Sequence, residues 1–165
     1  MNPLILTVAI DNTAFEYFNH LRSKYFPASR NYLAAHLTLF HALPSDTGII
    51  NTVGTVCQQQ PVFKMVVAKP VSIGRGVAFF LESEELLHFH KNLQHRWLDF
   101  LTPQDRQKLW PHITVQNKVT RPEAQSLLST LKEDFMPFSI GATGLQLWEY
   151  LNGPWKFIDE FRFRE

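Results

Sequence analysis

The stretch Ala35–Phe40 reads Ala-His-Leu-Thr-Leu-Phe, and the stretch Trp110–Val115 reads Trp-Pro-His-Ile-Thr-Val. Each contains a histidine, an apolar residue, a threonine and a second apolar residue in that order. Because side chains alternate across a β-strand, a histidine and a threonine two positions apart project from one face, while the interleaved apolar residues face the core. Both stretches are therefore predicted to be half-buried strands that present an imidazole beside a hydroxyl.

The number of these motifs exceeds chance. With seven histidines and 45% hydrophobic residues, composition alone gives about 0.1 expected occurrences of the pattern, whereas the chain contains two. Their placement is also matched, because a predicted order of strand, helix, histidine-containing strand and helix covers Leu4–Cys57 and recurs over Val77–Phe135. No linker rich in Gly, Ser or charge separates the two copies. We infer a duplicated chain whose two lobes share one cleft.

Apolar periodicity and capping signals predict the elements around the two motifs. Strands are expected at Leu4–Ile10, His36–Phe40, Val62–Ile73, Val77–Glu82 and His112–Val115, followed by a hairpin of Phe138–Tyr150 and Trp155–Phe163. Helices are expected from Thr13 to before Pro27, from Ser45 or Asp46 to Pro61, from Ser83 to before Pro103 and from Thr120 to Phe135. Thr13 and Thr120 are the expected N-caps of their helices, because a glutamate follows each at capping-box spacing.

The composition favours one domain in a reducing compartment. A chain of 165 residues with 45% hydrophobic residues can bury a core of its own. Cys57 is the only cysteine, so no intramolecular disulfide can form. The net charge of +1 argues against wrapping of duplex DNA, which relies on many lysine and arginine contacts to phosphates. We expect residues 1–165 to form a single domain that is cytoplasmic, monomeric and without a membrane segment.

Two histidines that face one another across a cleft suit phosphodiester cleavage. Near neutral pH one imidazole can be neutral while its partner is protonated, since an unperturbed ring has a pKa of about 6.5. In-line displacement at phosphorus needs one proton taken from the attacking oxygen and one given to the leaving oxygen on the opposite side. His36 and His112 are the candidates for these roles. The hydroxyls of Thr38 and Thr114 are candidates for hydrogen bonds to the phosphate oxygens.

The residues that carry these motifs also resemble a known family. Ala35–Pro44, taken together with Trp110–Val115, is similar to the paired signatures of the 2H phosphoesterase superfamily, and more narrowly to its bacterial 2′-5′ RNA ligase and cyclic phosphodiesterase group. Leu147–Tyr150 and Gly153–Trp155 resemble that group's final hairpin. The resemblance implies a bilobal α+β fold in which two antiparallel-rich sheets form a central cleft with helices outside.

The resemblance further implies an activity. That activity is metal-independent and cofactor-free chemistry on 2′,3′-cyclic phosphates or 2′-5′ linkages of an RNA terminus or small nucleotide, with RNA ligation as the reverse reaction. It assigns catalysis to His36 as proton donor and His112 as proton acceptor, and substrate binding to Thr38 and Thr114. Many relatives carry an arginine five residues after the second histidine, where this chain has Asn117. Phosphate clamping is therefore expected to differ.

Two other classes of protein remain open. One is an RNA- or nucleotide-binding module without turnover. The other is a metalloprotein built on the seven histidines, although His88 and His90 lie on different faces of their predicted helix and no carboxylate stands at ligand spacing. We expect these two and His95 to be solvated or half-buried. His41, five residues after His36, is expected on the opposite face of its strand and outside the site.

Overall fold

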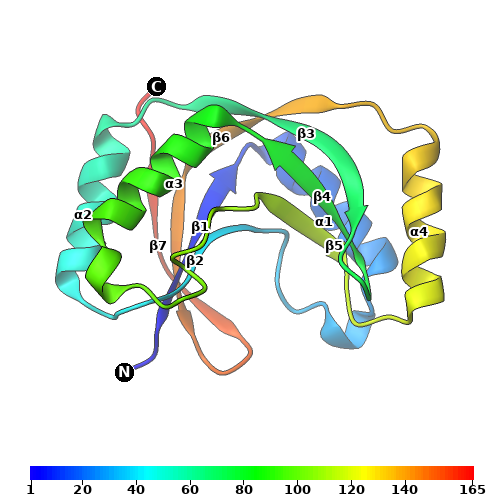
Figure 1. Cartoon of the computed structure of the whole chain (residues 1–165), viewed down its shortest axis with the longest axis horizontal. Coiled ribbons are helices and arrows are strands. Elements are labelled where there is room, and N and C mark those ends of the chain that lie inside the picture. The colour runs from blue at the N-terminus through cyan, green and yellow to red at the C-terminus, as the bar shows by residue number, and fades with distance from the viewer.

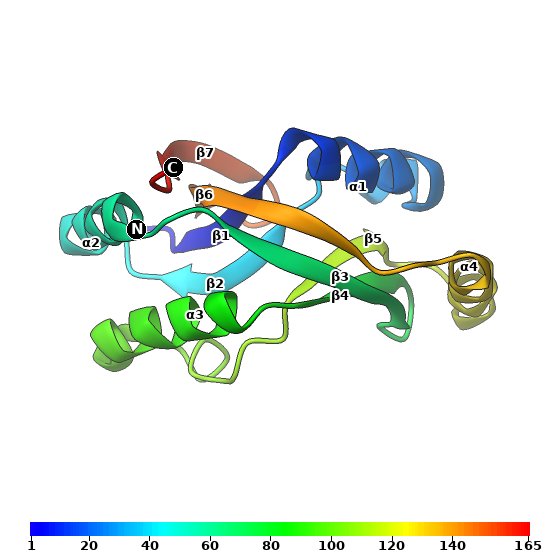
Figure 2. The same ribbon diagram turned by 90° about the horizontal axis from the view of Figure 1, so that it is seen from above.

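Seven strands form one continuous, curled antiparallel sheet that four α-helices flank (Figure 1, Figure 2). The computed structural model describes all residues from 1 to 165. The strands are β1 (Leu4–Ile10), β2 (Leu37–Leu43), β3 (Phe63–Ser72), β4 (Val77–Glu82), β5 (His112–Gln116), β6 (Phe138–Tyr150) and β7 (Trp155–Arg162). The helices are α1 (Asn12–Tyr25), α2 (Thr47–Gln59), α3 (Glu84–Arg96) and α4 (Arg121–Glu133), and single 3₁₀ turns cover Ala28–Arg30 and Leu98–Phe100. The α+β fold class expected from the sequence is confirmed.

The order of the strands shows the internal duplication. Along the sheet the order is β2-β1-β6-β3-β4-β5, and β7 adds to one edge of β6. This order is symmetric about the β6–β3 pair, so β2, β1 and β6 correspond to β5, β4 and β3. The two sheets expected from the sequence are the two halves of one sheet, which are joined where Phe63–Val67 pairs with Phe138–Ala142.

The two copies of the repeat are interlocked. α1 packs against β5 and α4 packs against β3 at one end of the molecule, whereas α2 and α3 lie at the other end (Figure 1). Because α1 belongs to the first copy and β5 to the second, each end of the molecule is built from both copies. This exchange brings β2 and β5, which carry the two motifs, into contact near the middle of the molecule (Figure 1).

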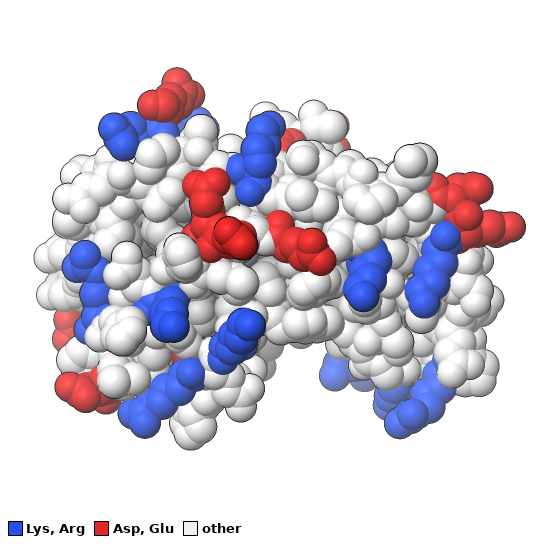
Figure 3. Space-filling model, turned by 45° about the horizontal axis from the view of Figure 1, so that its top comes forward, with Lys and Arg blue, Asp and Glu red and all other residues white.

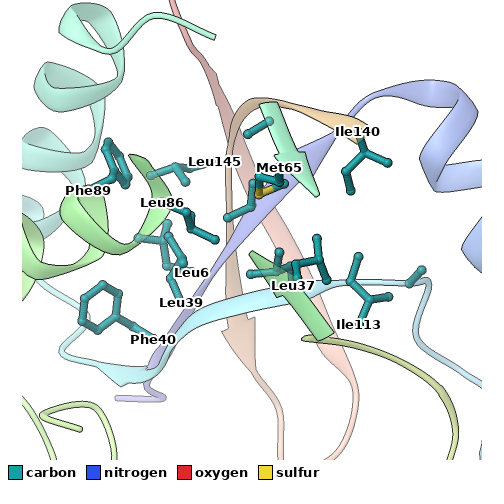
Figure 4. Close-up of a cluster of buried hydrophobic side chains, with 14 of the residues drawn as sticks. Leu6, Leu37, Leu39, Phe40, Met65, Leu86, Phe89, Ile113, Ile140 and Leu145 are labelled. Atoms are coloured by element: carbon teal, nitrogen blue, oxygen red, sulfur yellow. The ribbon is translucent and has the colours of Figure 1, made fainter. Parts of the chain in front are cut away.

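The core is built from the apolar residues that alternate with histidine and threonine. In β5 the histidine and threonine are half-buried, while Ile113 and Val115 are fully buried. In β2, Leu37 and Leu39 are buried in the same way. All four belong to one hydrophobic cluster that continues across the sheet. Figure 4 shows part of this cluster, including Leu37, Leu39 and Ile113.

The first helix begins earlier than the sequence predicts. Its N-cap is Asp11 instead of Thr13, because Oδ1 of Asp11 accepts a hydrogen bond from the backbone N–H of Ala14 at 2.9 Å. The second oxygen, Oδ2, accepts a hydrogen bond from the backbone N–H of Gly141 at 2.6 Å. One carboxylate therefore both starts α1 and attaches it to β6. The contact with β6 is remote in sequence, so local capping signals did not reveal it.

The other helix boundaries differ less from expectation. α3 ends at Arg96, before the predicted end, and Leu98–Phe100 continues as a 3₁₀ turn. The apolar period extends past the helix because Trp97, the C-cap, is itself buried. Asp46 and Thr120 are N-caps as predicted. None of the four helices has both the length and the apolar character that crossing a bilayer requires.

The double role of Asp11 predicts a large effect on stability. Asp11→Ala should lower the free energy of unfolding by about 2–4 kcal/mol, because it removes an N-cap and also leaves the N–H of Gly141 without its acceptor. Asp46→Ala, which removes an N-cap alone, should cost about 1 kcal/mol. Urea denaturation of the two variants measures both values. Equal losses would show that the bond to β6 contributes nothing.

Candidate active site

The two motif histidines are held in the same way. Nδ1 of His36 lies 2.8 Å from the carbonyl oxygen of Ala34, and Nδ1 of His112 lies 2.8 Å from the carbonyl oxygen of Trp110. A carbonyl oxygen can only accept, so Nδ1 carries the hydrogen in both rings. Nε2 is therefore the atom of each ring that is left to exchange a proton with a ligand. In both halves of the chain, the carbonyl oxygen belongs to the residue two positions before the histidine.

An aromatic side chain packs against each imidazole. The ring of Trp155, from β7, lies 4.7 Å from the ring of His36 between centroids. The ring of Trp110 lies 4.4 Å from the ring of His112. Trp110 remains 45% exposed, although the ring of Phe80 also stacks on it at 6.0 Å between centroids. The sequence places Trp110 two residues before His112, but it did not indicate that Trp155 of the final hairpin would contact His36.

The environment of the two rings favours their neutral forms. Burial lowers the pKa of His36 to about 4, and the positive charges of Arg22, His112 and His41 add to this effect, whereas the hydrogen bond to Ala34 opposes it. Burial also lowers the pKa of His112, again assisted by charge on His41. The histidines from the two halves of the chain are thus close enough for the charge of one to affect the other. An anion between them would raise both pKa values.

Arg22 is a buried cation near the two motifs that sequence analysis missed. Its side chain, on α1, donates from Nη1 to the carbonyl oxygen of Thr114 at 2.8 Å and from Nε to Oδ1 of Asn31 at 3.2 Å. Arg22 is 3% exposed and forms no ion pair, and burial lowers its pKa to about 10. Helical spacing could have revealed it, because Arg22 follows the buried Ala14 and Phe18 at intervals of four residues.

A cavity of about 140 Å³ lies between the motif strands. Thr38 of β2 and His112 of β5 both line it, together with residues of the loop from Gln104 to Trp110. The structure thus brings one candidate residue from each motif to a single cavity, while His36 and Thr114 are not part of its lining. Ligand sites for whole drug-sized molecules measure about 300–1,000 Å³, so this cavity suits a phosphate group. A base and ribose would lie outside it.

A larger cavity of about 810 Å³ lies elsewhere, between α1, β3 and β6. Its lining includes Tyr17, Phe63 and Phe138 but no residue of either motif. Size alone is therefore a poor guide to the site in this protein. The smaller cavity contains three titratable groups with shifted pKa values (His90, Asp105 and His112), whereas the larger cavity contains one, Tyr17. Such a cluster is the better indicator of chemistry.

Two of the histidines are not where the sequence predicts. His41 lines the same cavity as Thr38 and His112, although it was expected on the opposite face of β2. A β-bulge in β2 is the reason, because an extra residue shifts the alternation by one position. His90, expected to be solvated or half-buried, is 3% exposed, and its Nε2 lies 3.1 Å from the carbonyl oxygen of Leu39.

The remaining expectations concern metal and charge. No group of three or more His, Cys, Asp and Glu side chains is arranged to hold a metal ion. On the face drawn in Figure 3, basic and acidic side chains are interspersed, with several acidic groups near the middle.

Comparison with solved structures identifies the fold. TT0787 of Thermus thermophilus superposes with a TM-score of 0.69 over 98% of both chains at 15% identity. E. coli LigT complexed with 3′-AMP superposes with a TM-score of 0.64 over 99% of both chains at 16% identity. E. coli LigT complexed with NADP⁺ superposes with a TM-score of 0.62 over 99% of both chains at 15% identity. At these identities the likeness establishes the fold.

The family follows from the sequence itself. The profile of the 2′-5′ RNA ligase superfamily matches residues 10–154, which include both motifs and the final turn. A search against curated protein sequences gave no match. The chain belongs to the 2′-5′ RNA ligase superfamily of 2H phosphoesterases.

The lowered pKa of His36 predicts how stability depends on pH. Between its ordinary value of 6.5 and about 4, the unfolded chain binds a proton at His36 that the folded protein does not. Stability should therefore fall as the pH decreases through this range, and His36→Gln should reduce that fall. Urea denaturation at pH 7 and pH 5 measures it. His88→Gln, at an exposed position of α3, should retain the pH dependence of the wild type.

Proposed function

We propose that the protein is a metal-independent phosphodiesterase that acts on 2′,3′-cyclic phosphates or 2′-5′ linkages of RNA ends and small nucleotides. His36 and His112 are its acid and base, and the reverse reaction is 2′-5′ ligation. The observation that carries this proposal is the repeated geometry of the two rings, whose Nδ1 atoms both lie 2.8 Å from a carbonyl oxygen two residues earlier. Membership of the 2′-5′ RNA ligase superfamily supports the reaction class.

Hydrolysis of a cyclic phosphate then needs two coupled proton transfers. A water oxygen attacks phosphorus while one Nε2 accepts a proton from that water. The bond from phosphorus to one ribose oxygen breaks, and this oxygen takes a proton from the other Nε2. The hydroxyls of Thr38 and Thr114 donate to the phosphate oxygens that carry charge in the transition state. The product is a nucleoside 2′- or 3′-monophosphate, and the two histidines have exchanged protonation states.

The electrostatics favour His112 as the proton donor and His36 as the acceptor. Burial lowers the pKa of both, but the pKa of His36 falls further, to about 4. When a phosphate enters and one ring takes up a proton, that proton goes first to His112. This order is the reverse of the one that family resemblance implies. It follows from the closer burial of His36 and from its proximity to the charge of Arg22.

A small nucleotide is the substrate class that the site favours. The cavity of about 140 Å³ accommodates the phosphate, and the exposed part of Trp110 beside His112 offers a surface on which a base can stack. Structures of E. coli LigT in complex with 3′-AMP and with ATP show that a protein of this fold binds nucleotides.

Activity assays test the two histidines directly. Chelator-treated protein should hydrolyse at least one of the four nucleoside 2′,3′-cyclic phosphates or a 2′-5′ dinucleotide. His36→Ala and His112→Ala should each reduce turnover by about 10²–10⁴-fold, while His88→Ala should leave it unchanged. Turnover that persists in both histidine variants would refute the proposal. Tight nucleotide binding without turnover by the wild type would favour a binding module instead.

A substrate with a good leaving group tests the assignment of roles. Because 4-nitrophenolate leaves without a proton, hydrolysis of bis(4-nitrophenyl) phosphate should depend on the base but hardly on the acid. His112→Ala should therefore lose less than about tenfold in rate on this substrate, whereas His36→Ala should lose about 10²–10⁴-fold. Release of 4-nitrophenolate measures both rates. The opposite pattern would restore the order implied by family resemblance.

A further inference from the structure

β2 contains a bulge directly after its motif. Thr7 of β1 pairs with Thr38, and Leu6, the residue before Thr7, pairs with Phe40. Leu39 therefore has no partner in β1. Leu39 and Phe40 are both buried as a result. A second register shift places one more extra residue of β2 between Phe40 and Leu43. The side chain of His41 lies on the cleft side of the strand, where it is 46% exposed.

The second motif is followed by the same irregularity. In the pairing of β4 with β5, Ala78 pairs with Thr114 and Val77 with Gln116, so Val115 has no partner. Both extra residues lie three positions after the motif histidine. The residue that corresponds to His41 in the second half is therefore Asn117. The two halves share the backbone device, but only the first half carries a side chain there that can become positive.

Asp105 fixes the ring of His41. Its carboxylate accepts hydrogen bonds from the backbone N–H groups of His41 and Ala42 at 2.9 Å, and its Oδ1 lies 3.2 Å from Nδ1 of His41. Burial of this carboxyl would raise its pKa, but these hydrogen bonds outweigh burial and hold the pKa of Asp105 below its ordinary value. A carboxylate only accepts, so Nδ1 of His41 carries the hydrogen and Nε2 is free.

The pair of His41 and Asp105 is held in place by hydrogen bonds from α3. The loop that carries Asp105 is attached to α3, because Nε2 of Gln94 lies 2.9 Å from the carbonyl oxygen of Asp105 and 2.8 Å from that of Gln107. His90, also on α3, contacts the carbonyl oxygen of Leu39 in the bulge. Within this pair the side chain of His41 is exposed, whereas the side chain of Asp105 is fully buried.

The cavity between the motifs is rich in hydrogen-bond donors. Thr38, His41, Lys108 and His112 line it, with the amides of Gln104 and Gln107. Its single carboxylate is that of Asp105, whose oxygens are both occupied by the N–H groups of His41 and Ala42. A cavity lined by these donors favours the binding of an anion. His41 is positioned in it beside one residue of each motif.

We propose that His41, oriented by Asp105, is a third histidine of the site and, as an imidazolium, donates a hydrogen bond from Nε2 to a phosphate oxygen of the ligand. This inference rests on the proposed function for its substrate, a nucleotide phosphodiester, but not for the contact itself. Because a bound phosphate keeps its non-bridging oxygens throughout the reaction, His41 contributes to the ground state and the transition state alike. Its loss therefore weakens binding more than it slows the chemical step.

Steady-state kinetics distinguish this role from that of the motif histidines. On a nucleoside 2′,3′-cyclic phosphate, His41→Ala should raise KM by about 10–100-fold, as expected for a lost charge-assisted hydrogen bond. Its kcat should stay within about threefold of the wild type, whereas His36→Ala lowers kcat. His95→Ala, an exposed histidine of α3, is the matched control and should leave both parameters unchanged. A KM for His41→Ala within about twofold of the wild type overturns the proposal.

A binding measurement separates this proposal from the proposed function. Calorimetric titration with adenosine 2′-monophosphate and with inorganic phosphate should give about 10–100-fold weaker binding to His41→Ala than to the wild type, whether or not the wild type turns over any substrate. Addition of inorganic phosphate should also shift the ¹⁵N signal of Nε2 of His41, identified by its absence in the variant. Equal affinities, or a His41 signal that phosphate leaves unchanged, would overturn the contact even if the enzyme is active.

Discussion

The burial of alternate residues in β2 and β5 is the constraint on which the whole site depends. Leu37, Leu39, Ile113 and Val115 are all 2% exposed or less, and burying each such side chain contributes about 1.5–3 kcal/mol. A slip of either strand by one residue would move these side chains to the surface and the histidines into the core. The hydrophobic core thus fixes the register of both strands and, with it, holds the two imidazoles on the cleft side.

The backbone and the surroundings then set the chemistry of those rings. A carbonyl oxygen fixes Nδ1 of each histidine as a donor, so every proton exchanged with a ligand passes through Nε2. Burial favours the neutral form of both rings, and the nearby charge of Arg22 adds to this effect for His36. Arg22 also connects the helix of the first repeat to the carbonyl oxygen of Thr114 in the second. Arg22 therefore both links the two halves and lowers the pKa of His36.

The duplicated backbone carries unequal side chains, and this inequality suits a reaction that needs one acid and one base. Both motif strands have a bulge after the threonine, but His41 stands beyond the first bulge and Asn117 beyond the second. His36 packs against Trp155 from the final hairpin, whereas His112 packs against Trp110 from the preceding loop. Burial lowers the pKa of both rings, but the charges of Arg22 and His112 act on His36 alone, so the symmetric fold gives the two rings different surroundings.

The sequence by itself determined the elements and the motif residues, because apolar period and capping are local properties. It also indicated the duplication, since the order of elements around His36 recurs around His112. Only the tertiary structure decided which face His41 occupies, that Asp11 caps α1, and that Arg22 and Asp105 belong to the surroundings of the site. Each of these depends on an extra residue in a strand pairing or on a hydrogen bond between segments remote in sequence. Local periodicity contains no information about such pairings, whereas the burial of the core fixes them.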